Sequence, residues 1–341
     1  MIKFFRKIRQ NLLMENKTGK YFKYAIGEIA LVVIGILIAL SINNWNENKK
    51  NNIIVNSVLK QIHSELAENI KMIDNVVLTY RVKDSLIRLI MNNKLDNKNF
   101  IGVPDLFIKT AAVVTINDQG FKNLMLNTNN LSSNLDPIIN DLKKLYISYK
   151  ENVDFGNDAT DKNVASYLEW LKLNTTWYNN VYYGDGGKLT EEQINFYYTD
   201  NSLFKNWLLG YYNVAIDGQY RYTMAFRHYA FEAYKDLTEI LKLNKEENDS
   251  FSISLTDQEK KQIAGTYQNK EQTYKVVLKN NKLYSNINER EDELVFINKT
   301  FYFPNRNSVP GFRTVNLDEN KNVTGFTFRN GNDELLFKKI N

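Results

Sequence analysis

The chain has 341 residues, with 44 Lys and Arg against 39 Asp and Glu, and it contains no cysteine. The lack of cysteine excludes a disulfide framework and a lipid-modified cysteine anchor. The first 23 residues hold 7 basic residues and 1 acid, which leaves 37 against 38 in the rest, so the basic excess needed for nucleic-acid binding is missing there.

Residues 1–23 form a basic segment in which Phe5, Ile8 and Leu12 recur at helical spacing with Lys and Arg between them. This pattern predicts a short amphipathic helix that lies on a membrane surface, where anionic lipid attracts the basic side chains. The segment is too short to hold a kinase or a DNA-binding domain. We therefore expect the working part of the protein to follow it.

Residues 24–43 are predicted to be a transmembrane helix. From Tyr24 to Ile42 the sequence YAIGEIALVVIGILIALSI carries one ionisable residue, Glu28, and its length at about 1.5 Å of rise per residue matches a bilayer core. Basic residues gather before the span, whereas the exit INNWN is neutral. The positive-inside rule therefore predicts a cytoplasmic N-terminus and a periplasmic remainder.

Two alternatives remain open at this span. Glu28 lies about one turn inside the cytoplasmic edge, where its carboxylate either reaches the headgroups or serves a function within the membrane. Residues 29–40 also have the length of a signal-peptide core, followed by a small-x-small site at Ala39-Leu40-Ser41. The long basic lead and the acid favour an anchor that is retained.

Residues 44–245 are predicted to be a periplasmic helical bundle, elongated and antiparallel. Apolar residues at three- and four-residue steps predict a long amphipathic helix over 51–91, and shorter helices are expected over 105–114 and 117–126. Asp136-Pro137 begins another helix, whose apolar stripe weakens over 155–161. The last helix runs from Ser202 to about Leu243 and carries an aromatic stripe, which indicates either helix packing or a ligand pocket: Trp207, Tyr211, Tyr212, Tyr220, Tyr222, Phe226, Tyr229, Phe231 and Tyr234.

A polar linker is predicted over residues 246–254, and residues 255–341 change to the two-residue period of strands. Thr256 and Glu259 form a capping box for one short helix. Seven strands are expected over 273–278, 282–287, 293–297, 300–303, 312–317, 323–329 and 334–340, with hairpin turns at 280–281 and 330–331. We expect a small antiparallel barrel or curved sheet that closes its own core.

Two resemblances to known families point the same way. MIKFFRKIRQNLL, GEIALVVIGILIAL and SINNWNE resemble the N-terminus of an uncharacterised family of single-pass membrane proteins of Gram-negative bacteria, which has no known activity. LTDQEKKQIAGTYQN, NNKLYSN, FYFP and NVTGFTFRNGNDELLFKKI resemble a small lipocalin-like domain of unknown function that is appended to some penicillin-recognising serine hydrolases. That resemblance covers residues 255–341 and implies no catalytic residue within them.

Searches for catalytic motifs give only chance matches. SxxK occurs at 57–60 and 202–205, but the KTG at 17–19 precedes both and no Ser-Asp-Asn triplet exists. Asp154, Asp158 and Asp161 imitate a calcium loop without its glycine and terminal glutamate. The two histidines, His63 and His228, have no partners at metal-ligand spacing.

The sequence thus predicts a mainly α protein with one transmembrane helix, a helical bundle and a C-terminal all-β domain. We expect no enzyme activity, no catalytic, cofactor or metal site and no cofactor, and instead a binding or scaffolding role. Expected partners are membrane lipid through residues 1–45 and a protein or second copy through the helical region, with no nucleic acid. The alternatives are a passive spacer and an enzyme with an unrecognised carboxylate site, for which Asp185 is the candidate.

Overall fold

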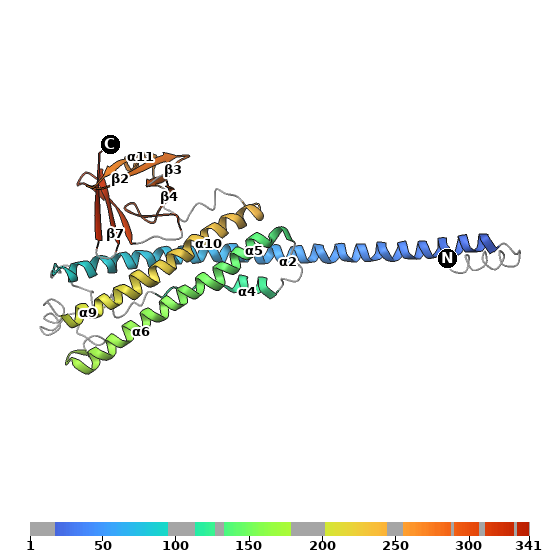
Figure 1. The fold of residues 1–341 in the computed structure, drawn as a ribbon, viewed down its shortest axis with the longest axis horizontal. Coiled ribbons are helices and arrows are strands. Elements are labelled where there is room, and N and C mark those ends of the chain that lie inside the picture. The colour runs from blue at the N-terminus through green and yellow to red at the C-terminus, as the bar shows by residue number, and fades with distance from the viewer. Residues whose placement is uncertain are drawn as a thin grey trace.

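The computed structural model describes residues 18–94, 113–126, 133–178, 202–243, 255–287, 290–306, 311–330 and 333–340. Its first element, α2 (Thr18–Met91), is one uninterrupted helix of 74 residues. Figure 1 shows its N-terminal half as a bare rod and its C-terminal half covered by other helices and by a barrel. The predicted span and the predicted helix over 51–91 are therefore parts of one helix.

The covered half of α2 has an apolar stripe because Leu59, Ile62, Leu66, Ile70 and Ile73 repeat every three or four residues. All five are fully buried. The other described helices of this region share one buried cluster with the stripe. In chain order they are α4 (Gln119–Leu126), α5 (Asp136–Lys143), η3 (Lys144–Tyr149), α6 (Lys150–Asn174), α9 (Ser202–Tyr211), η4 (Tyr212–Tyr220) and α10 (Arg221–Ile240), with a short 3₁₀ turn, η2 (Ser133–Leu135), before α5. The segments η3 and η4 are π-helical turns.

Two long helical rods accompany α2, of which the second packs directly along α2 and the first packs mainly on the second. The first runs continuously from α5 through η3 to α6, and the second from α9 through η4 to α10. Tyr80 meets Gln219 while His63 meets Thr238, so the second rod is antiparallel to α2. Figure 1 shows the same arrangement of three long rods side by side.

The apolar stripe does weaken over residues 155–161, where the buried residues are Gly156 and Thr160, and α6 nevertheless continues through this stretch without a break. A Cβ on Gly156 would lie 2.9 Å from the Cα of Gln219. The glycine therefore marks a place where α6 and η4 approach each other closely and does not mark a break. Of the predicted helices, 117–126 appears as α4, whereas 105–112 lies outside the described residues.

The C-terminal region is a closed barrel of eight antiparallel strands in the order of the chain. A short helix, α11 (Asp257–Ile263), precedes it and has the predicted capping box. The strands are β1 (Gly265–Gln268), β2 (Thr273–Lys279), β3 (Lys282–Ile287), β4 (Arg290–Phe296), β5 (Phe301–Pro304), β6 (Phe312–Leu317), β7 (Val323–Asn330) and β8 (Asp333–Lys339). The mainly α protein with a C-terminal all-β region is confirmed.

The barrel has two apolar faces. Its interior is a cluster of its own, in which Tyr267, Tyr274, Tyr302 and Phe326 are fully buried. Its outer face contributes a second set, which belongs to the same buried cluster as the helices: Val295, Phe301, Phe303 and Phe312. Side chains alternate across a strand, so these outward residues seat the barrel on the helices while the inward residues fill it.

Candidate functional site

A group of buried polar side chains lies where η4 crosses α2 and α6. Gln219 of η4 is 1% exposed, and its Oε1 accepts hydrogen bonds from the Tyr80 hydroxyl of α2 and, at 3.1 Å, from Thr160 of α6. Its Nε2 donates to Oδ1 of Asn157. π-Helical turns are rare and often accompany function, but here the turn aims an amide at partners that satisfy it. We call these four residues the Gln219 network.

Asn157 also shows how non-helical backbone is accommodated between helices. Its side chain accepts from the backbone N–H of Val114 at 3.1 Å and donates to the same residue's carbonyl at 2.9 Å. Asn69 of α2 makes the matching pair with the backbone of Asn117, both at 2.9 Å. Buried backbone groups need such partners, so the two asparagines position the stretch before α4.

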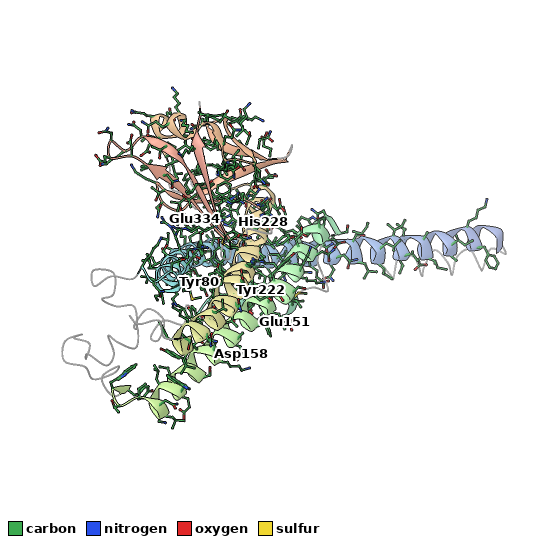
Figure 2. All side chains as sticks on the ribbon, turned by 60° about the vertical axis from the view of Figure 1, so that its left-hand side comes forward. Tyr80, Glu151, Asp158, Tyr222, His228 and Glu334 are labelled. Carbon is green, nitrogen blue, oxygen red and sulfur yellow. The ribbon has the colours of Figure 1, made fainter. Side chains whose placement is uncertain are left out.

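A lysine is buried beside the Gln219 network. Lys83 of α2 is fully buried, and its Nζ donates to the Tyr211 hydroxyl at 2.6 Å. Burial lowers the pKa of Lys83 to about 8, because the low-dielectric interior penalises the ammonium. Burial also raises the pKa of Tyr211, so the phenol stays protonated. Figure 2 places Tyr80, one helical turn away, among the packed helices.

The barrel meets the helices over a buried ion pair. Asp74 of α2 accepts from Nε of Arg227 at 2.5 Å and from Nη2 at 2.9 Å. The guanidinium also lies 4.4 Å from the ring centroid of Phe303, on the outer face of the barrel. The ion pair thus joins α2, α10 and β5 at one point.

Further polar contacts surround this junction. Arg329 of β7 donates to Ser85 at 3.1 Å and lies 3.9 Å from Asp84, both on α2. The Tyr220 hydroxyl donates to the carbonyl of Gly311 at 2.9 Å. His228 and Glu334, labelled in Figure 2, lie where the helices and barrel face each other, and His228 Nδ1 donates to the Asn305 side chain at 3.1 Å.

Most candidates from the sequence lie apart from this junction. Ser57 and Lys60 are exposed on α2, and Ser202 and Lys205 begin α9. Asp154 and Asp158 are exposed on α6, a helix and not a loop, and each pairs with a lysine four residues away. Asp185 lies outside the described residues.

The two histidines are both packed. His63 stacks on Tyr234 with ring centroids 4.1 Å apart. The Thr238 hydroxyl donates to the backbone carbonyl of Tyr234, so it accepts a hydrogen bond from Nε2 of His63. Burial lowers the pKa of His63. Among the described residues, no three His, Asp or Glu side chains gather in a way that holds a metal ion.

The aromatic stripe of the last helical rod is used for packing. Tyr211, Tyr220 and Phe226 are fully buried, and Trp207 stacks on Tyr167 with centroids 3.9 Å apart. Sequence periodicity predicts these rings but misses the Gln219 network and the Asp74–Arg227 pair, whose members come from distant parts of the chain. Taken together, the buried polar groups hold helices and barrel in place.

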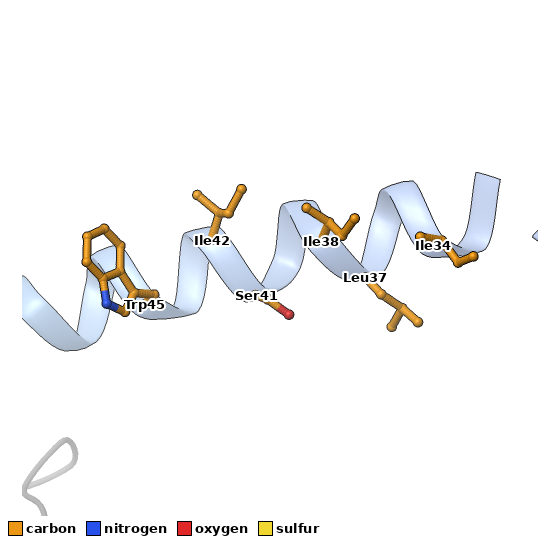
Figure 3. Close-up of a pocket in the computed structure, with 6 residues that line it drawn as sticks. All are labelled: Ile34, Leu37, Ile38, Ser41, Ile42 and Trp45. Atoms are coloured by element: carbon orange, nitrogen blue, oxygen red, sulfur yellow. The ribbon is translucent and has the colours of Figure 1, made fainter. Parts of the chain in front are cut away.

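The bare half of α2 carries a different surface. It is the one helix in the described part of the chain that is long and apolar enough to cross a membrane. Figure 3 shows an apolar hollow along it, lined by Ile34, Leu37, Ile38, Ser41, Ile42 and Trp45. These large side chains are exposed, as on a helix that faces lipid.

Comparisons with known proteins find a family similarity that covers part of the helical region. No curated protein and no solved structure matches the chain. The matching segment begins within the apolar half of α2 and ends within α6, so it includes neither α10 nor the barrel. Over residues 28–165 the chain is similar to a family of unknown function (DUF6090).

Proposed function

We propose that this protein is a single-pass anchor in the inner membrane of a Gram-negative cell that carries a binding or scaffolding unit in the periplasm and is not an enzyme. Residues 1–45 contact lipid. The helical region, a bundle, receives a protein partner or a second copy of the chain. The barrel, which resembles the lipocalin-like domain named above, is held on that bundle.

The continuity of α2 carries the proposal. The apolar half and the half that forms the core of the helical region belong to one helix, with no turn between them. The first fully packed stripe residue after the span is Val55, about 12 residues beyond residue 43, so the folded region begins about 18 Å from the span. A stiff connection of this kind suits a protein that holds a binding surface at a fixed height above a membrane.

The orientation is supported by the charges at the two ends of the span. Seven basic residues precede it, and the exit is neutral up to Glu47. Trp45 lies at the exit with Lys49 Nζ 5.4 Å from its ring centroid, as is typical of a residue at the membrane interface.

The placement can be tested with reporters. We expect a reporter enzyme that works only in the periplasm to be active when it is fused after Asn341, and a reporter that works only in the cytoplasm to be inactive there. We also expect the purified protein to retain its first residues. Cleavage near Ala39 would show that residues 24–43 are a signal peptide and would contradict the anchor.

The binding role can be tested by photo-crosslinking in cells. Ile147 and Phe155 are apolar residues eight positions apart on the same rod, and they are 57% and 63% exposed. We expect a photoreactive residue at either position to form a discrete adduct with a partner or a second copy. The same residue at Lys275, exposed on the barrel, is the matched control. Absence of adducts from the helical positions would contradict a partner there.

A further inference from the structure

We draw no further inference here: the strongest candidate, the apolar hollow along the bare half of α2 that runs from Ile34 to Trp45, carries none because nothing in the described part of the chain shows what covers it.

Discussion

Arg227 and Asp74 form a two-point ion pair, with N–O distances of 2.5 and 2.9 Å, at the place where the barrel rests on the helices. The arginine is 1% exposed. Because its guanidinium also faces Phe303, the pair joins α2, which includes the proposed membrane span, to the barrel. The barrel is therefore seated on the helices through α10 and α2 at once.

Breaking this ion pair from one side should be costly. Asp74→Leu or Arg227→Met alone leaves a buried charge, and we expect each to lower the free energy of unfolding by about 3–5 kcal/mol. The double variant removes both charges and should recover most of that loss. Urea unfolding of the four proteins in detergent measures the coupling. Single losses below about 1 kcal/mol would mean that water reaches the pair.

Lys83 predicts how stability changes at alkaline pH. Its pKa is about 8 in the folded protein and near 10.5 when unfolded, so between these values the unfolded chain binds more protons. Below about pH 8 the buried ammonium therefore lowers the free energy of unfolding by its full amount. As the pH rises above this value, the free energy of unfolding increases by up to about 3 kcal/mol.

Lys83→Met provides the comparison, because both proteins share the titration of the tyrosines. The parent should gain stability relative to Lys83→Met between about pH 8 and pH 10, measured by urea unfolding at each pH. A difference that stays constant over this range would show that Lys83 keeps an ordinary pKa.

Gly156 should tolerate no side chain. A Cβ there would meet the Cα of Gln219 at 2.9 Å, so Gly156→Ala should separate α6 from η4 and cost about 1–3 kcal/mol despite the better helix propensity of alanine. Gly210→Ala is the control, since its Cβ would meet only the side-chain amide of Asn163 at 3.3 Å. Thermal unfolding should separate the two, and an equally stable Gly156→Ala would disprove the close crossing.

We expect the barrel to fold without the helices but then to expose an apolar surface. Its interior cluster is complete without the helices, so a fragment of residues 250–341 should show a cooperative transition by circular dichroism. Phe301, Phe303 and Phe312, however, lose their cover, and we expect the fragment to self-associate in gel filtration. Phe303→Ser with Phe312→Ser should keep it monomeric. An unfolded fragment would mean that the barrel needs the helices to close.

Periodic features can be predicted from the sequence because each depends on neighbours in the chain. Leu59 to Tyr80 recur at helical spacing and are buried, and Asn280 and Asn281 adopt φ of 48° and 63° in the predicted hairpin turn. Seven of the eight strands are predicted in this way. The pattern misses β1 because that strand has four residues, of which only Tyr267 is buried.

The junction and the buried polar groups cannot be predicted. Arg227 and Asp74 are 153 residues apart, and a single pair has no period. The π-helical turn that aims Gln219 at its partners is a shift of backbone hydrogen bonds without a residue signature. Arg313 reads in sequence as one polar residue of a short strand, and only the register of the closed barrel shows that it lies inside.

We infer that the proposed membrane span and the core helix of the folded region form one rigid rod, because α2 runs through both without a break. The chain has no cysteine, so spin labels at Asn44→Cys and Lys71→Cys would be the only ones present. Double electron–electron resonance in nanodiscs should give one narrow distance near about 40 Å, as roughly 27 residues of continuous helix require. A second protein with labels at Glu151→Cys and Lys172→Cys, both within α6, shows how wide the distance distribution is for two labels on one continuous helix. A broad distribution for the first pair, or one centred well below about 40 Å, would show a break after the span and contradict a rigid rod.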